Sequence, residues 1–268
     1  MIIVKLMGGL GNQLFQYALG RNLAYKNNTR LKLDVNFFNH SLSRHYALSY
    51  FNIEASFATP DDLTHLFSPD HIIKEKSFYF DPIILNLPDN IYLDGYWQSQ
   101  QYFIAIDSLL RKEFTPGLQL STETLSLLDQ INSVNSVSIH IRRGDYVYNP
   151  VTNKIHGIIP LTYYEHAIEL ITKRISNPHF FIFSDQPDWV KSNLSLNFPF
   201  QIVQCNQEQD DLLLMSYCQH NIIANSTFSW WSAWLNSNEK KIVIAPLKWF
   251  NNFAYTARDL LLPTWITL

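Results

Sequence analysis

The second half of the chain alternates short apolar runs with amphipathic segments, and this alternation restricts the possible folds more than any other feature of the sequence. The apolar runs predict strands at 137–142, 180–183, 200–205, 221–224 and 242–245. The segments between them predict helices at 161–175, 187–194, 210–219 and 228–238. Strands that are apolar throughout and separated by helices form a parallel sheet covered on both faces. The second half is therefore predicted to be an α/β domain.

The N-terminal half repeats this organisation less regularly. Its predicted elements are a strand at 2–6, a helix after the glycine-rich turn, a strand at 31–34, a helix start at 61–66, a strand at 90–95 and a helix at 118–132. We therefore expect an α/β protein with two Rossmann-like domains. The expected boundaries are 1–132 for the N-terminal domain and 133–268 for the C-terminal domain.

Charge and composition exclude several classes of protein. The 20 basic and 23 acidic residues give a formal net charge of −3, which leaves no electrostatic footprint for general nucleic-acid binding. The sequence has no signal-peptide pattern and no apolar run near the ~18 residues of a membrane span. We therefore predict a soluble, cytoplasmic protein with at most peripheral membrane contact. Cys205 and Cys218 lie in apolar stretches and are predicted to be reduced core thiols.

Three of the eight glycines, Gly8, Gly9 and Gly11, lie in one short motif between the first strand and the first helix. Glycine allows positive φ and a close approach of the backbone to a ligand. The amide groups at the start of a helix favour an anion or a sugar hydroxyl. Asn12 and Gln13 add side-chain donors and acceptors at the same place. The motif therefore predicts a turn that faces a ligand.

The same motif half-matches the dinucleotide-binding fingerprint, which leaves a second interpretation open. Gly9 and Gly11 have the spacing of its first two glycines, but Leu14 stands where the third is required. Asp34 could mimic the acidic residue that binds a ribose. On this interpretation the chain is a nicotinamide-dependent oxidoreductase. The aromatic content of 15% leaves a third interpretation open, a non-catalytic carbohydrate-binding protein.

The motif HIRRGDY at 140–146 is the strongest candidate site in the sequence. It ends an apolar strand whose alternation directs His140 and Arg142 to one face and Arg143 to the other. At the carboxyl end of a parallel strand, Arg142 points into the crevice where ligands bind, and its planar fork suits a diphosphate. We predict that Arg142 binds phosphate, and that a structural ion pair, Arg143 with Asp145, holds the loop.

Two further strand ends bring polar residues to the same edge of the sheet. Asp185 follows one strand, and the loop 225–229 follows another and begins a helix, where hydroxyls and amides suit a phosphate. Asp210 and Asp211 either interact with a helix dipole or accept hydrogen bonds from a guanine. A cluster of tryptophans is predicted to be core, namely Trp230, Trp231 and Trp234. Because no Asp-x-Asp or His-x-x-x-His motif occurs, we expect chemistry without a metal ion.

Four blocks of the sequence resemble the α-1,2-fucosyltransferases of glycosyltransferase family eleven. They are GGLGNQLFQYA at 8–18, HIRRGDY at 140–146, FSDQPDW at 183–189 and HNIIANSTFSWWSAWL at 220–235. The ending at 262–266 is similar too, so the resemblance covers essentially the whole chain. It implies a bacterial, cytoplasmic enzyme with a GT-B type of fold. It also implies inverting transfer of L-fucose from GDP-β-L-fucose to the 2-hydroxyl of a terminal β-galactoside, without metal or cofactor.

The resemblance also implies a role for each matching residue. The C-terminal domain would bind GDP-fucose, with Arg142 on the β-phosphate. The implied donor-binding residues are His140, Arg142, Arg143, Asp185, Asp211, Asn225, Ser226, Thr227, Phe228 and Ser229. Those implied on the acceptor side are Gly11, Asn12 and Gln13. The acceptor would be a galactoside-containing glycan, with O-antigen-type polysaccharides and lipid-linked glycans among the candidates.

Catalysis of this transfer requires stabilisation of the negative charge that grows on the departing GDP. Preorganised donors commonly supply the largest catalytic contribution, so Arg142 is the first catalytic candidate. A general base would take the proton of the acceptor hydroxyl. Asp145 and His140 are both candidates for it.

Overall fold

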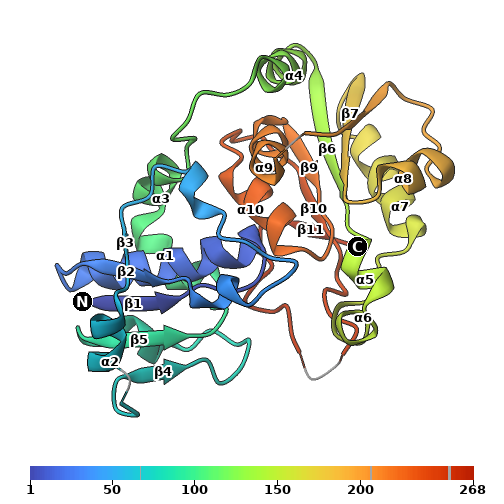
Figure 1. The fold of residues 1–268 in the computed structure, drawn as a ribbon. Coiled ribbons are helices and arrows are strands. Elements are labelled where there is room, and N and C mark those ends of the chain that lie inside the picture. The colour runs from blue at the N-terminus through green and yellow to red at the C-terminus, as the bar shows by residue number, and fades with distance from the viewer. Residues whose placement is uncertain (67, 206, 253–254) are drawn as a thin grey trace. The chain divides into compact units, whose positions relative to one another are not determined.

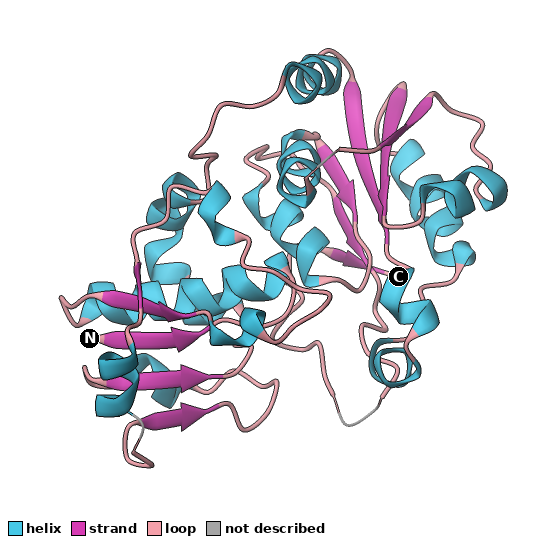
Figure 2. Ribbon diagram, in the orientation of Figure 1, coloured by secondary structure: helices cyan, strands magenta, loops and turns pink. Residues whose placement is uncertain are grey.

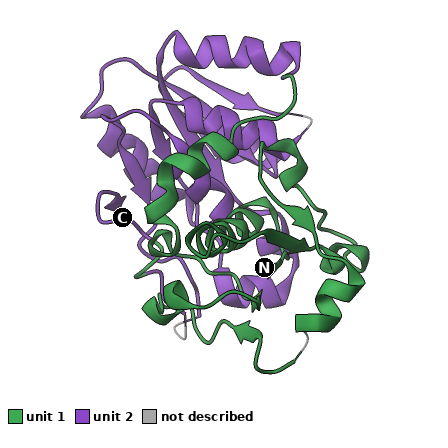
Figure 3. Cartoon of the chain, turned by 90° about the vertical axis from the view of Figure 1, so that its left-hand side faces the viewer, with its two compact units in different colours: residues 1–119, 258–260 green, residues 120–257, 261–268 purple. Residues whose placement is uncertain are grey.

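The chain forms two compact units in the computed structural model, which describes residues 1–66, 68–205, 207–252 and 255–268 (Figure 3). Unit 1 comprises residues 1–119 and 258–260. Unit 2 comprises residues 120–257 and 261–268. Each unit contains one parallel β-sheet, which confirms the predicted α/β class.

Unit 1 has a five-stranded sheet in the order β3-β2-β1-β5-β4 (Figure 1). Its strands are β1 (Ile2–Lys5), β2 (Leu31–Asp34), β3 (Ser56–Phe57), β4 (Ile72–Lys74) and β5 (Ile91–Asp94). Its α-helices are α1 (Leu10–Lys26), α2 (Pro60–Leu66) and α3 (Asp107–Glu113). Short 3-10 helices are η1 (Asn36–Asn39), η2 (Leu48–Tyr50), η3 (Pro82–Asn86), η4 (Gln100–Tyr102) and η5 (Ile104–Ile106).

Buried polar side chains tie α1 to its surroundings. The α1 residue Gln16 accepts a hydrogen bond from the Met7 amide at 3.0 Å and donates to the Gly95 carbonyl at 3.1 Å. Arg21 donates to Glu113 at 2.9 Å, and Tyr17 donates to the same carboxylate at 2.6 Å. These bonds satisfy groups that would otherwise be costly to bury, and they fix α1 against the ends of β1 and β5 and against α3.

Unit 2 has a six-stranded sheet in the order β11-β10-β9-β6-β7-β8. Its strands are β6 (Asn135–Ile141), β7 (Pro178–Ser184), β8 (Phe200–Val203), β9 (His220–Ile222), β10 (Val243–Ala245) and β11 (Ile266–Thr267). Its helices are α4 (Thr122–Asn132), α5 (Gly144–Tyr148), α6 (Pro150–His156), α7 (Leu161–Thr172), α8 (Pro187–Asn193), α9 (Glu208–Tyr217) and α10 (Thr227–Leu235). Numbered along the unit from β6, the spatial order is 3-2-1-4-5-6, that of a dinucleotide-binding Rossmann fold.

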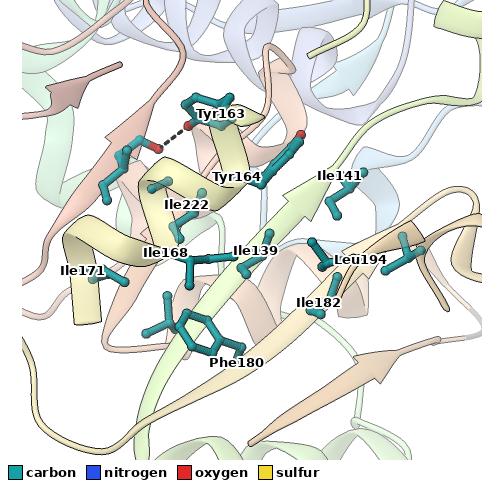
Figure 4. Packing of buried hydrophobic residues seen from close by; sticks show 14 residues of the cluster. Ile139, Ile141, Tyr163, Tyr164, Ile168, Ile171, Phe180, Ile182, Leu194 and Ile222 are labelled. Atoms are coloured by element: carbon teal, nitrogen blue, oxygen red, sulfur yellow. Dashed lines mark hydrogen bonds between the residues drawn. The ribbon is translucent and has the colours of Figure 1, made fainter. Parts of the chain in front are cut away.

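The sheet of unit 2 is covered on both faces, as the apolar strands predicted (Figure 2). On one face α7 and α8 pack on β6 and β7, with Ile139, Ile168 and Ile182 in the cluster that Figure 4 shows. On the other face α4 and α9 pack on alternate residues of β7, among them Phe181 and Phe183. Trp230, Trp231 and Trp234 are all buried, which confirms that they are core.

The division between the units lies earlier than the expected boundary at 132. Helix α4, which we assigned to the first domain, packs in unit 2 because Leu127 and Ile131 fill the apolar layer under α9. The hydroxyl of Thr124 also donates to Asp210 of α9 at 3.1 Å. Neither cysteine forms a disulfide in the described structure, and Cys218 is buried whereas Cys205 is half-buried. Within the described ranges, no helix has the length and apolar character needed to cross a membrane.

Candidate functional site

The carboxyl ends of β6 and β9 form the topological switch point of unit 2. These two strands are neighbours, and the chain continues from β6 toward one edge of the sheet and from β9 toward the other. Loops that diverge in this way open a crevice in which α/β proteins bind ligands. Arg142 follows β6 directly, and the loop 225–229 follows β9. The topology therefore brings the two sequence motifs to the same place.

Arg142 lies at this point between two carboxylates. One guanidinium nitrogen donates to Asp145 at 2.5 Å, and another lies 3.0 Å from Asp185. The Arg142 side chain is 22% exposed. Burial opposes its charge, but Asp185 and Asp145 together raise the pKa of Arg142 above its usual range. The guanidinium is thus fixed, permanently charged and still accessible.

Arg143 has a different environment from its neighbour. Its amide donates to Asp185 at 2.9 Å, its Nε donates to Gln186 at 3.2 Å, and its guanidinium lies 3.6 Å from the ring centroid of Trp189. The expected ion pair between Arg143 and Asp145 is therefore wrong, because Arg142 is the partner of Asp145. Arg143 supports the loop through a cation–π contact and hydrogen bonds.

Close packing requires glycine at position 144. A Cβ atom at Gly144 would lie 2.4 Å from Oδ2 of Asp185, the same oxygen that pairs with Arg142. A larger residue would push that carboxylate away from the guanidinium. The glycine of the HIRRGDY motif therefore allows the ion pair to form.

His140 is buried behind this cluster. Its ring centroid lies 5.6 Å from that of Phe228, and its Nδ1 is among the buried side-chain atoms that lack a hydrogen-bond partner in the described structure. Burial, assisted by Arg142, lowers the pKa of His140 to about 3. The imidazole is therefore neutral near pH 7, and the burial of its ring disfavours the base role that the sequence left open for it.

The loop 225–229 is largely buried, and only Thr227 and Phe228 are partly exposed. The Asn225 amide donates to the carbonyls of His156 at 2.9 Å and Trp249 at 3.1 Å. Ser229 is fully buried, and its hydroxyl donates to the Ser226 carbonyl at 3.2 Å. These contacts occupy the Asn225 nitrogen and the Ser229 hydroxyl, whereas the Asn225 Oδ1 is buried without a hydrogen-bond partner in the described structure. Thr227 is half-buried at the first position of α10.

Sequence reasoning missed two aromatic residues at this site. Tyr146 donates to the Asn225 carbonyl at 3.1 Å, and its ring lies 5.5 Å from the Arg142 guanidinium carbon. The ring of His156 stacks on Tyr146 at 4.9 Å with an interplanar angle of 9°. Burial and Arg142 lower the pKa of His156, while Asp145 opposes them. Tyr146 stands in the HIRRGDY motif, but no sequence pattern marked His156.

Asp211 lies on α9, after β8, and β7 separates that strand from β6. Cys205 donates hydrogen bonds to its carboxyl group from the thiol and the backbone. The Oδ1 atom of Asp211 is buried without a hydrogen-bond partner in the described structure. Burial raises the pKa of Asp211 to about 7, and the two hydrogen bonds from Cys205 oppose the increase. The structure thus leaves Asp211 outside the ion-paired cluster of Arg142.

The switch point of unit 1 lies between β1 and β5 and contains the glycine motif. Gly8 has a φ of 78°, and a Cβ atom there would lie 2.6 Å from the side-chain nitrogen of Asn12. Asn12 accepts a hydrogen bond from the Gln98 side chain at 3.0 Å. Glycine is therefore required both for the backbone conformation and for the position of Asn12.

Three other candidate residues of unit 1, Gln13, Gly11 and Asp34, are buried. Gln13 is fully buried and donates to the carbonyls of Gly8 at 3.1 Å and His45 at 2.9 Å, so it braces the turn instead of facing an acceptor. Gly11 is buried as well. Asp34 is buried and accepts from the Tyr92 hydroxyl at 2.7 Å and the Asn36 amide at 3.0 Å. Both of its oxygens are occupied, which disfavours the dinucleotide interpretation.

Metal ligands are not grouped in the ranges that the structure describes. Among those residues, no three His, Cys, Asp or Glu side chains lie close enough together to hold a metal ion. The charged groups that the described site offers to an anion are guanidinium groups.

The whole chain is similar to known glycosyltransferases. An α-1,2-colitosyltransferase of Escherichia coli is 34% identical, and the match covers 100% of this chain and 98% of that protein. A galactoside α-(1,2)-fucosyltransferase 1 of Rattus norvegicus is 27% identical over 85% of this chain and 61% of that protein. The crystal structure of fucosyltransferase NodZ from Bradyrhizobium aligns with a TM-score of 0.51 at 14% identity, covering 86% of this chain and 91% of that one.

The likeness to NodZ shows that the two parallel α/β units form a GT-B fold. Residues 1–268 match the family model described as Glycosyl transferase family 11. The match includes both switch points and every block of sequence that carried the resemblance. The chain belongs to glycosyl transferase family 11.

Proposed function

We propose that the protein transfers L-fucose from GDP-β-L-fucose to the 2-hydroxyl of a terminal β-galactoside, with inversion at the anomeric carbon. The observation that supports this most is the position of Arg142 at the switch point of a Rossmann-type sheet. There the guanidinium is charged, held by two carboxylates and still accessible to a diphosphate. The family match and the α-1,2-fucosyltransferase relative support the choice of reaction.

In this reaction the bond between the fucose C1 and the β-phosphate oxygen breaks, and GDP keeps the electron pair. Arg142 donates hydrogen bonds to the β-phosphate as its negative charge increases. Because Asp145 and Asp185 already hold the guanidinium in place, little reorganisation accompanies the reaction. Ser226 and Thr227, at the start of α10, add donors for the same phosphates.

The acceptor oxygen forms a bond to C1 from the opposite face of the sugar and loses its proton. We assign the base role to Asp145, because its carboxylate is a third exposed beside Arg142 whereas the His140 ring is buried. We assign the guanine to Asp211, whose buried, unpartnered oxygen is suited to accept from a ring N–H or an exocyclic amine. Donor binding uses no metal ion in this proposal, because Arg142 and the α10 amides neutralise the diphosphate.

The colitosyltransferase relative supports a second candidate donor, GDP-colitose. Colitose is fucose without its 3-hydroxyl, so the two donors make the same diphosphate contacts and differ only at the sugar. A site built to hydrogen-bond the 3-hydroxyl would discriminate strongly against the sugar that lacks it. The ratio of kcat/KM for the two donors therefore identifies the natural one.

The direct test measures GDP release from GDP-fucose and from GDP-colitose, with and without methyl β-galactoside. We expect turnover that depends on the galactoside and that excess EDTA leaves unchanged. NMR of the product should show an α-1,2 linkage. Loss of activity in EDTA that Mg²⁺ or Mn²⁺ restores would contradict the metal-free proposal. Absence of turnover with both donors and several galactosides would contradict the proposed function itself.

A further inference from the structure

The turn that follows β5 in unit 1 has a strained backbone. Trp97 has a φ of 57°, in the left-handed region that a bulky side chain rarely adopts. The same residue is 1% exposed, and its indole nitrogen is among the buried atoms without a hydrogen-bond partner in the described structure. Such strain costs energy and persists only where the surroundings enforce it, typically at functional sites.

Glu75, which follows β4, enforces this conformation. Its carboxylate accepts hydrogen bonds from the amides of Tyr96 at 2.7 Å and Trp97 at 3.0 Å. Burial raises the pKa of Glu75, and the two hydrogen bonds oppose the increase. A Cβ atom at Gly95 would lie 2.4 Å from the Glu75 side chain and 2.9 Å from the Trp97 ring. The turn is therefore fixed by the buried Glu75 carboxylate, and Gly95 leaves the space that the Glu75 side chain and the Trp97 ring occupy.

The turn presents alternate side chains to the surroundings. Gly95, Trp97 and Ser99 are buried, whereas Tyr96 and Gln98 are partly exposed. Gln98 donates to the side-chain oxygen of Asn12, which is itself partly exposed. The side-chain amides of Asn12 on α1 and Gln98 in the turn are thus hydrogen-bonded to each other at the switch point between β1 and β5.

An aromatic ring and a cation lie at the same edge. Tyr96 stacks on Phe78 at 6.4 Å with an interplanar angle of 24°. A guanidinium nitrogen of Arg44 lies 3.3 Å from the position that a Cβ atom at Gly9 would occupy. Burial raises the pKa of Tyr96, and Arg44 opposes the increase, which places Arg44 within electrostatic range of the phenol.

We propose that Asn12, Tyr96 and Gln98 form a binding subsite for the ring of a neutral hexopyranoside, the acceptor galactoside of the proposed function on which this inference rests. Sugar hydroxyls both donate and accept hydrogen bonds, as the two side-chain amides do. The apolar face of a galactose ring packs against an aromatic side chain. Glu75 is a positioning residue, since its carboxylate accepts hydrogen bonds from the backbone of the turn.

Gln98→Ala tests this subsite, with Gln101→Ala as its matched control. Gln101 is the same residue type three positions later, and it is exposed. We expect Gln98→Ala to raise the KM for methyl β-galactoside about ten-fold, the effect of one lost hydrogen bond. The KM for GDP-fucose should stay at the wild-type level, and Gln101→Ala should leave both KM values unchanged. An unchanged acceptor KM, or an equal rise in both KM values, would overturn the proposal.

Glu75→Gln provides a second test through the backbone of the turn. The glutamine keeps the size of the side chain but replaces one acceptor oxygen with a donor, so it can no longer accept from both amides. We expect the acceptor KM to rise while the GDP-fucose KM does not. Wild-type values for both would show that the turn does not position the acceptor.

Saturation-transfer NMR with methyl β-galactoside, recorded without donor, separates this inference from the proposed function. If the wild type does not turn over GDP-fucose but its galactoside signal disappears in Gln98→Ala and persists in Gln101→Ala, the subsite stands and the donor assignment fails. An equal signal in both variants, or none in the wild type, overturns the subsite whatever the turnover.

Discussion

Arg142 is held by Asp145 and Asp185 while a fifth of its side chain remains exposed, so its charge is available to a ligand. We predict that Arg142→Ala lowers kcat by about 100- to 1000-fold, the usual effect of removing one donor from a developing charge. Steady-state GDP release measures the change. Arg174→Ala, at an exposed arginine of the same unit, should keep the wild-type rate. Normal turnover by Arg142→Ala with an intact circular dichroism spectrum would refute the role of Arg142.

His140 makes a prediction about pH and stability. Its pKa is about 3 in the folded protein, whereas an unfolded histidine has a pKa near 6.5. Protons therefore bind preferentially to the unfolded chain as the pH falls below about 6.5. The contribution of His140 to stability is complete above that pH and is lost progressively toward pH 3.

Urea unfolding at pH 7.5 and 5.5 measures this loss. Between the two pH values, the wild type should lose roughly 1 kcal/mol more than His140→Asn. The same substitution at the exposed His166 serves as the control for replacing a histidine by asparagine. Identical pH dependence in wild type and His140→Asn would show that the imidazole is not held neutral by burial.

Helix α4 gives a prediction at the scale of one element. Ile131 is fully buried between the sheet of unit 2 and α9, whereas Leu125 on the same helix is 43% exposed. Ile131→Ala should lower the free energy of unfolding by about 2–5 kcal/mol, the usual cost of a cavity. Leu125→Ala, measured by the same urea titration, should change it by less than about 0.5 kcal/mol. Equal effects would mean that α4 does not belong to the packing of unit 2.

The regular elements of unit 2 could be predicted because their packing dictates their pattern. The strand β7, which is buried on both faces, reads as a continuous apolar run, and the buried face of α7 recurs at helical spacing. Several elements of unit 1 are too short to show a helical or strand periodicity in the sequence. The strand β3 has two residues and β4 has three. The 3-10 helices, such as the three-residue η2, are too short to produce the spacing of apolar residues that marks a helix.

The candidate site was only partly predictable for a related reason. Arg142 was predicted correctly to lie at the end of a strand because the apolar run just before it in the sequence marks that strand. The roles of Asn225 and Gln13 depend on carbonyl groups far away in the sequence, those of Trp249 and His45 among them. Residue type alone cannot tell whether an amide binds a ligand or holds a distant loop.

At the scale of the whole molecule, GDP binding should stabilise the fold. A ligand that binds only the folded state raises the free energy of unfolding by about 2.7 kcal/mol at a hundred times its Kd. We predict a rise in the thermal midpoint with GDP, without added metal, and a smaller rise for Arg142→Ala. Differential scanning fluorimetry measures both. A rise with NAD but not with GDP would favour the oxidoreductase interpretation.

Residues 258–260 complete unit 1, although the preceding residues 120–257 belong to unit 2. The carboxylate of Asp259 accepts a hydrogen bond from the Phe80 amide at 3.0 Å, and Leu260 is buried. A chain emerges from the ribosome with its N-terminus first. Unit 1, which is translated first, therefore cannot complete its packing until nearly all of unit 2 has been synthesised.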